Sequence, residues 1–247
     1  MTRLVYDGSF EGLLTSIFQV YEERLDQVLI VSEKDLQPDF FSEDCLVYSD
    51  MIKSERVWKG LKPFKLLRQM IYKSYLREAV GTENTILEAI KYVLTTKNET
   101  DYGHAAILQL SKWTKEVGRE KHRMEAFVRF KRAKDNTYIA LIEPDYNVLP
   151  LISRHFKNRY ADQVFMIYDL KRGYGIYYDL NKVDFIVLDE ANLDNLKQIL
   201  HEEESWFDAM WQDYFKSTGI KSRINMKLHK QHVPVRYWKY LNEKKPN

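Results

Sequence analysis

Residues 137–180, "TYIALIEPDYNVLPLISRHFKNRYADQVFMIYDLKRGYGIYYDL", decide the fold of this chain. Apolar residues run through "TYIALIEP" (137–144), "QVFMIYD" (163–169) and "YGIYYDL" (174–180), which predicts three strands. The intervening segment "DYNVLPLISRHFKNRY" (145–160) has helical spacing and potential capping residues at its start. The turn signal "LKRG" (170–173) joins the last two strands into a hairpin.

Two further strands are predicted on either side of this stretch. They are "AFVRFKR" (126–132), joined to the next strand by the turn signal "AKDN", and "VDFIVLD" (183–189). The resulting order β-β-α-β-β-β implies a mainly antiparallel sheet with a helix on one face. We therefore expect an α+β fold, with a helical N-terminal part and an antiparallel sheet covered by helices.

The N-terminal part has the periodicity of helices with one or two short strands. "RLVYD" reads as the first strand, "LQPDFFSED" as a loop, and residues 10–25 as a helix whose start Asp7 and Ser9 could cap. The polar, turn-rich segment "TTKNETDYG" (95–103) predicts a domain boundary, which divides the chain into regions 1–97 and 98–247. Residues 191–216 are predicted to form a C-terminal helix, followed by a basic tail.

Charge is unevenly distributed, although the formal net charge is only +2. Residues 112–134 carry a net +6, residues 179–213 a net −8, and residues 217–247 a net +7. This uneven distribution points to an electrostatic role for particular surfaces. No apolar run approaches the ~20 residues needed to cross a bilayer, so we expect no membrane partner.

Cys45 is the only cysteine, which excludes a disulfide framework and favours an intracellular, cytoplasmic protein. An iron–sulfur cluster built from this chain alone is also excluded, because such clusters take several thiolates. The spacing of His229 and His232 suits metal ligands, but no companion thiol follows. The sequence therefore predicts neither a metal site nor a bound cofactor, and "DGSFEG" (7–12) is interpreted as a helix entry.

Several acid/base groups are predicted at the ends of neighbouring strands and on the connecting helix. If the protein is an enzyme, its candidate catalytic residues are Glu143, Asp145, His155, Asp169 and Arg172. Capping and turn chemistry offer a structural explanation of the same residues, which we favour. In that explanation Asp145 or Asn147 caps the helix, and Asp169 and Arg172 shape the hairpin.

Cationic and aromatic residues form candidates for nucleic-acid binding. In the predicted strand 126–132, Phe127, Arg129 and Lys131 share one face, opposite Val128 and Phe130. Cations suit phosphates, and aromatic rings suit unpaired bases. The candidates are Arg129, Lys131, Arg132, Lys227, Lys230, Arg236, Tyr237, Trp238 and Lys239.

The C-terminal segment "KQHVPVRYWKYL" (230–241) has two alternative roles. It could bind nucleic acid, or it could pack as a strap on the acidic segment 190–213 of its own domain. In the packed form Trp238 or Tyr240 would be substantially buried, and Pro234 would keep the preceding chain extended. Lys230, Arg236 and Lys239 would remain exposed.

Four segments, "LVYDGSFEGLLTSIFQVYEER", "VGREKHRMEAFVRFKR", "YIALIEPDYNVLPLISRHFKNRYADQVFMIYDLKRG" and "HVPVRYWKYL", together resemble a bacterial family of probable DNA metabolism proteins. In some members of that family a similar region is fused to a uracil-DNA-glycosylase-like domain. Others stand alone and are encoded beside a putative DNA-repair or DNA-modification radical S-adenosylmethionine protein. This chain resembles the stand-alone type, because it ends directly after "RYWKYL". The resemblance carries over no catalytic residues.

Three functional hypotheses follow. The first is a DNA-binding or adaptor protein in DNA repair or modification, whose partners are DNA and a radical S-adenosylmethionine protein. The second is an enzyme that acts on a nucleotide or nucleic acid through the acid/base candidates. The third is a protein-interaction module without nucleic-acid contact. A pocket shared by the acid/base groups would favour the second, and a contiguous basic surface that joins the strand 126–132 to the tail would favour the first.

Overall fold

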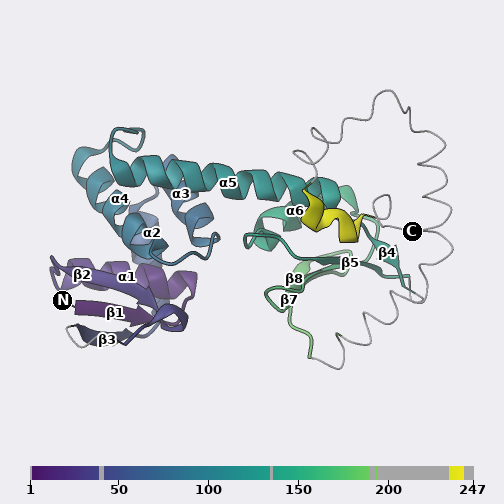
Figure 1. The fold of residues 1–247 in the computed structure, drawn as a ribbon, viewed down its shortest axis with the longest axis horizontal. Helices are drawn as coiled ribbons and strands as arrows, with labels where there is room; N and C mark the ends of the chain where they lie inside the picture. Colours follow the sequence, from purple (N-terminus) through teal and green to yellow (C-terminus); the bar gives the residue numbers. More distant parts are fainter. Residues whose placement is uncertain (1, 39–41, 134–135, 190–192, 194–233, 242–247) are drawn as a thin grey trace. The chain divides into compact units, whose positions relative to one another are not determined.

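The chain forms two compact units, Met1–Gly118 and Arg119–Asn247 (Figure 1). The computed structural model describes residues 2–38, 42–133, 136–189, 193 and 234–241, with the backbone alone of Lys239 and Tyr240. The α-helices within these residues are α1 (Phe10–Glu22), α2 (Met51–Gly60), α3 (Lys65–Tyr75), α4 (Thr82–Thr96), α5 (Ala105–Phe127) and α6 (Leu149–Arg159). The mixed α+β class is confirmed, whereas the domain boundary near residue 97 stays a prediction.

The first unit contains a parallel three-stranded sheet in the order β2-β1-β3. Its strands are β1 (Thr2–Tyr6), β2 (Val28–Ser32) and β3 (Glu43–Val47). The sequence predicted a loop up to Asp44, because the strand "EDCLV" begins with two acids and has no apolar alternation. Pairing with β1 fixes it as a strand, with Cys45 opposite Leu4 and Val47 opposite Tyr6.

Helices α1, α3 and α4 contribute the main core of the first unit. Ser9 caps α1, because its Oγ accepts a hydrogen bond from the Gly12 backbone N–H at 2.9 Å. This confirms the predicted helix entry in "DGSFEG". Ile17 of α1 and Ile90 of α4 are almost fully buried in one cluster with the β1 residue Leu4.

The long helix α5 continues through Phe127, where the sequence pattern predicted a strand from Ala126. Val128 still donates its backbone N–H to the Met124 carbonyl at 3.1 Å. Strand β4 is limited to Lys131–Arg132. The prediction that Phe127, Arg129 and Lys131 share one strand face was therefore wrong. The alternation "FVRFK" is overridden because Val117, Met124 and Val128 are all buried at helical spacing.

The second unit contains a five-stranded sheet in the order β4-β5-β6-β7-β8. The remaining strands are β5 (Tyr138–Ile142), β6 (Phe165–Asp169), β7 (Tyr174–Tyr178) and β8 (Val183–Ile186). With α6 between β5 and β6, the order β-β-α-β-β-β is confirmed. Three neighbouring pairs are antiparallel, and β5 pairs with β6 in parallel. The sheet is thus mainly antiparallel, and its one parallel pair brings the carboxyl ends of β5 and β6 to the same edge.

Helix α6 packs on one face of this sheet through aromatic side chains. Phe156 of α6 lies 6.5 Å from Phe165 of β6, measured between ring centroids. Phe165 also lies 5.2 Å from the ring of Tyr178 on β7. The residue before α6 is Val148, and no side chain caps the helix. The prediction that Asp145 or Asn147 caps it was therefore wrong.

The C-terminal described segment forms the 3-10 helix η3 (Val235–Tyr240). Pro234 precedes it with φ −55° and ψ 140°. Because the residues from Val235 onward form the 3-10 helix, the prediction of an extended segment before Trp238 was wrong. The predicted helix 191–216, the acidic segment 190–213 and the cations Lys227 and Lys230 lie outside the described residues, apart from Leu193. In the part of the chain that is described, no helix combines the length and apolarity needed to span a membrane.

Candidate functional site

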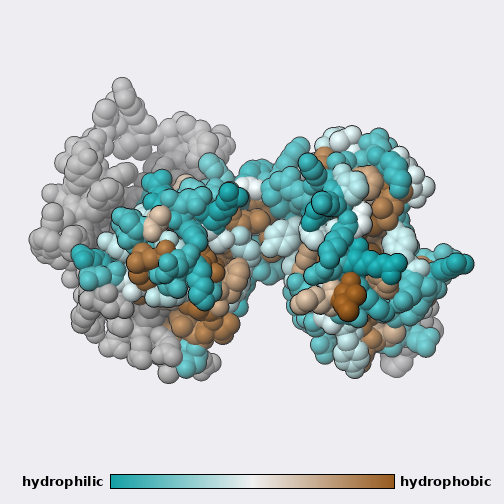
Figure 2. All heavy atoms as spheres, turned by 180° about the vertical axis from the view of Figure 1, so that it is seen from behind, coloured by the Kyte–Doolittle hydropathy of each residue, from teal (hydrophilic) through white to brown (hydrophobic). Residues whose placement is uncertain are grey.

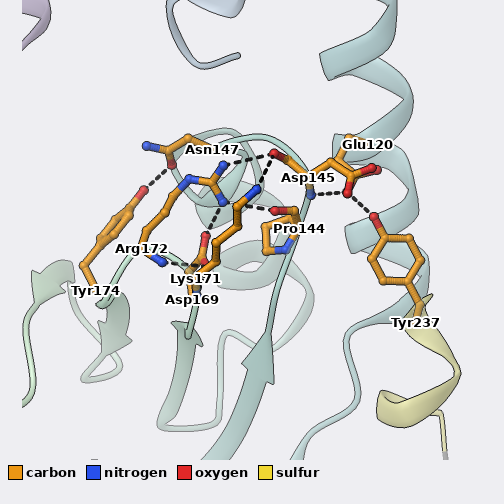
Figure 3. A network of polar contacts seen from close by, with 9 residues as sticks. All are labelled: Glu120, Pro144, Asp145, Asn147, Asp169, Lys171, Arg172, Tyr174 and Tyr237. Carbon is orange, nitrogen blue, oxygen red and sulfur yellow. Dashed lines mark hydrogen bonds and ion pairs between the residues drawn. The ribbon is translucent and has the colours of Figure 1, made fainter. Parts of the chain in front are cut away.

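Two loops meet at the carboxyl ends of β5 and β6, where the acid/base candidates were predicted (Figure 3). Lys171 donates through Nζ to the Asp145 carbonyl at 3.3 Å, and Arg172 donates to the same carbonyl at 3.2 Å. Arg172 also donates to the Pro144 carbonyl at 3.1 Å. The two loops are therefore tied together by cations that bind backbone oxygens.

Asp169 has the contacts of a turn residue. Its side chain is fully buried and accepts hydrogen bonds from the backbone N–H groups of Lys171 at 2.9 Å and Arg172 at 3.3 Å. It also forms an ion pair of 2.9 Å with the Arg172 guanidinium, which is 8% exposed. Burial raises the pKa of the Asp169 carboxyl, although the arginine and the amides oppose this shift. Asp169 and Arg172 thus stabilise the β6–β7 hairpin.

The other three acid/base candidates have different surroundings. Asp145 is exposed, its backbone N–H donates to Glu120, and its carboxylate binds Arg236. His155 lies on α6 with its Nδ1 3.7 Å from a carboxylate oxygen of Glu125. Glu143 is half-buried. Two of the best-formed pockets lie in the first unit, and none of the five candidates lines either of them.

Tyr237 anchors the C-terminal segment on α5 (Figure 3). Its side chain is 2% exposed, and its hydroxyl donates to the carboxylate of Glu120, itself 1% exposed. Burial and the Glu120 carboxylate both raise the pKa of this hydroxyl, which keeps it a donor. In this structure the Tyr237 ring is covered, so it cannot stack on a base.

Arg236 also contacts the carboxylates around the Tyr237 anchor. Its guanidinium binds Asp145 and lies 3.6 Å from Glu120. Trp238 is half-buried, and the side chains of Lys239 and Tyr240 lie outside the described residues. The described part of the tail therefore has the contacts of a strap that packs on its own unit.

Sequence reasoning missed Glu120, the centre of this anchor. Its carboxylate also accepts the Asp145 backbone N–H at 2.8 Å and lies 3.3 Å from Arg123. One signal was available, because Glu120 stands between Val117 and Met124 on the apolar face of α5. A carboxylate at such a position requires buried partners.

Cationic side chains gather where the β4 segment meets the end of α6. The Phe130 ring lies 5.6 Å from Phe156 and 5.2 Å from Tyr160. These contacts hold residues 129–132 beside the C-terminal end of α6, which carries its own cations. We define the cationic patch as Arg129, Lys131, Arg132 and Arg159.

The cationic patch is accessible to a ligand. Arg129, Arg132 and Arg159 are exposed. Arg132 donates to the Asn136 side chain at 2.6 Å, and the Arg159 guanidinium carbon lies 5.8 Å from the centre of the Tyr160 ring. These neutral partners orient the side chains without cancelling their charge. The macrodipole of α6 favours a cation such as Arg159 at its C-terminal end.

A small recess in the first unit brings together groups with shifted pKa values. It has a volume of about 50 Å³ and is lined by Tyr6, Tyr75 and Glu83 among others. Tyr6 hydrogen-bonds Glu83 at 3.1 Å, and Tyr75 donates to the Gly8 carbonyl at 2.9 Å. Burial raises the pKa of all three, that of Tyr75 to about 12. These groups have partners within the unit and are consistent with a structural role.

Cys45 and the pair His229 and His232 are the remaining candidate metal ligands. Cys45 is half-buried against the core of the first unit. His229 and His232 lie outside the described residues. Among the residues that the structure does describe, no three His, Cys, Asp or Glu side chains are grouped so as to hold a metal ion.

Fold and surface together define an α+β protein whose second unit exposes a cationic patch and secures its C-terminal segment through a buried carboxylate. The chain belongs to the family described as a domain of unknown function, DUF4130, whose model matches residues 80–243. This match includes all of α5, the five-stranded sheet and η3. A search of the curated proteins found no match.

Proposed function

We propose that this protein is a DNA-binding or adaptor protein in DNA repair or modification. Its partner would be the radical S-adenosylmethionine protein that the resemblance implies. The cationic patch is the observation that carries the proposal, because its cations come from two elements that the Phe130 contacts bring together. Because the sequence has a single cysteine, any radical chemistry would belong to the proposed partner.

Phosphate binding is the chemistry for which the cationic patch is suited. Arginine binds phosphate oxygens in a bidentate manner, and each cation that neutralises a phosphate releases counterions from DNA. Contacts of this kind position a protein on DNA without reading its sequence. The protein would therefore bind the backbone, and recognition of a lesion or base would belong to the complex with its partner.

The enzyme hypothesis receives less support. Asp169 and Arg172 are bound to each other and to backbone groups, and Asp145 binds Arg236. A general acid or base must reach a substrate proton. These three side chains instead stabilise a hairpin and a strap. If the protein does not bind DNA, the third hypothesis, a protein-interaction module without nucleic-acid contact, is the one to accept.

Fluorescence anisotropy with labelled single- and double-stranded DNA tests the proposal. The test variant replaces Arg129, Lys131 and Arg132 by Ala. The matched control replaces Lys59, Lys62 and Lys65 of the first unit by Ala, which changes the net charge equally. We expect DNA affinity to fall about tenfold or more only in the test variant, as expected from the loss of about 1.4 kcal/mol or more of binding free energy.

The adaptor role requires a second experiment. The protein and the neighbouring radical S-adenosylmethionine protein are co-expressed, purified through a tag on one of them, and assayed for DNA binding separately and together. We expect a complex that binds DNA more tightly than either protein alone. Absence of a complex would leave a DNA-binding protein and remove the adaptor role.

A further inference from the structure

The first unit contains a large apolar pocket formed by α1, α2 and α4. Its volume is about 500 Å³, which lies within the range of about 300–1,000 Å³ typical of small-molecule sites. Its aliphatic walls come from all three helices and from the residue after α2. These side chains are Ile17, Val57, Leu61, Ile90 and Leu94. Figure 2 shows a mostly hydrophilic surface interrupted by small apolar areas, so an apolar pocket of this size needs an explanation.

Two aromatic residues of α1 line the pocket together with charged groups. Tyr21 is 45% exposed, although it is a large hydrophobic residue. Lys53 Nζ lies 5.1 Å and the Arg56 guanidinium carbon 5.5 Å from the centre of the Phe18 ring. The pocket therefore has the cation Arg56 at the Phe18 wall, with Lys53 beside that ring, and an aliphatic interior.

The charged groups at this wall differ in their partners. Lys53 forms an ion pair of 2.8 Å with Glu22, an acid that lines the pocket. Arg56 is exposed and has no carboxylate within ion-pair distance among the residues that the structure describes. One cation thus stands beside an apolar volume without a carboxylate partner, which favours an anionic group on a ligand.

Gly60 is a pocket residue at which a larger side chain can be introduced. It ends α2 and lines the pocket, and a Cβ atom built on it would meet no atom within 4 Å. Its backbone does not require positive φ. A larger side chain could therefore be placed there without strain, and it would occupy the space that a ligand needs.

We propose that this pocket binds an amphiphilic anion, whose apolar body lies against the aliphatic walls and whose carboxylate, sulfonate or phosphate binds Arg56. A small ligand fits better than a base of nucleic acid, because the walls offer few groups that could bind the polar edges of a base. The site lies in the first unit and does not depend on the cationic patch. Its failure and the failure of DNA binding are therefore distinguishable.

Binding of 8-anilinonaphthalene-1-sulfonate, an apolar dye with one sulfonate, tests this proposal. Gly60→Phe fills the pocket, and Arg56→Glu reverses the charge at its wall. Lys62→Phe and Lys62→Glu make the same changes at an exposed position that does not line the pocket. We expect saturable dye fluorescence in the wild type and both controls, with the Kd raised tenfold or more in the two test variants.

Competition then identifies the ligand chemistry. Decanoate should displace the dye from the wild-type protein at least tenfold more effectively than decanol. Equal displacement by the two would refute the role of Arg56. If decanoate does not displace the dye, the proposal that the pocket binds a small amphiphile is refuted. A partner polypeptide that binds the same wall would then be the alternative. Unchanged dye binding in Gly60→Phe would refute the site, and if that variant does not fold, unchanged binding in Arg56→Glu would refute it.

Discussion

Replacing Tyr237 by Phe removes a single hydroxyl from the contact that anchors the C-terminal segment. The ring stays in place, since Phe has the same shape, and its centroid remains about 6.0 Å from that of Phe127. What changes is the hydrogen bond to Glu120, a carboxylate only 1% exposed. The substitution therefore isolates the polar part of the anchor from its packing.

The expected loss of stability depends on the hydrogen-bond partners that Glu120 keeps in Tyr237→Phe. A hydrogen bond to a charged group contributes about 1.5–3 kcal/mol. Glu120 keeps the Asp145 backbone N–H at 2.8 Å and Arg123 at 3.3 Å, so its charge is still partly satisfied. We therefore expect Tyr237→Phe to lower the free energy of unfolding by about 1.5–2 kcal/mol, near the lower end of that range. Tyr237→Ala should cost about 3–5 kcal/mol, because it also removes the buried ring.

Urea denaturation of both variants measures these losses, and limited proteolysis reports release of the C-terminal segment. A double-mutant cycle with Glu120→Gln isolates the pair. We expect a coupling energy of about 1 kcal/mol or more, within the range found for residues in contact. A Tyr237→Phe variant with wild-type stability and wild-type proteolysis would refute the anchor.

Three further predictions concern stability. Gly12→Ala should cost about 1–3 kcal/mol in chemical denaturation, because its Cβ would clash with the Asp7 carboxylate. Arg172→Met should cost about 3–5 kcal/mol in the same assay, since it leaves the buried Asp169 without its ion pair. A loss below ~1 kcal/mol in either variant would contradict these contacts. Burial and Glu11 raise the pKa of Tyr75 from 10.0 to about 12. The contribution of the Tyr75 hydroxyl to the free energy of unfolding is therefore complete below pH 10 and is lost as the pH rises toward 12. In denaturation experiments from pH 9 to 12, the free energy of unfolding should fall less steeply with pH for Tyr75→Phe than for the wild type. An identical fall in both proteins would count against the burial of the Tyr75 hydroxyl.

The sequence predicted the five-stranded sheet well, because its strands are separated by strong turn signals. The parallel pairing of β5 with β6 follows from the helix between them. The first sheet was harder to predict, since β3 begins with Glu43 and Asp44 and depends on long-range pairing with β1. The segment 126–132 was misassigned because an alternating pattern overlapped the last turn of a helix whose buried face continues to Val128.

The candidate site was predictable in composition but not in its contacts. The sequence identified Asp145, Asp169 and Arg172 as residues at strand ends, and these lie together in two connected loops. It could not show that Arg236 binds Asp145, because these residues are 91 positions apart. Contacts at such separations depend on the packed fold, which local patterns do not encode.

The salt dependence of DNA binding tests the central claim most directly. The observed binding constant for duplex DNA is measured between about 50 and 200 mM salt for the wild type, the Arg129/Lys131/Arg132→Ala variant and the Lys59/Lys62/Lys65→Ala control. If the cationic patch holds the backbone, the slope of log K against log salt should become shallower by ~0.9 per lost phosphate contact, and therefore by up to about 2.7 in the patch variant alone. A folded patch variant with the wild-type slope and affinity would contradict the account.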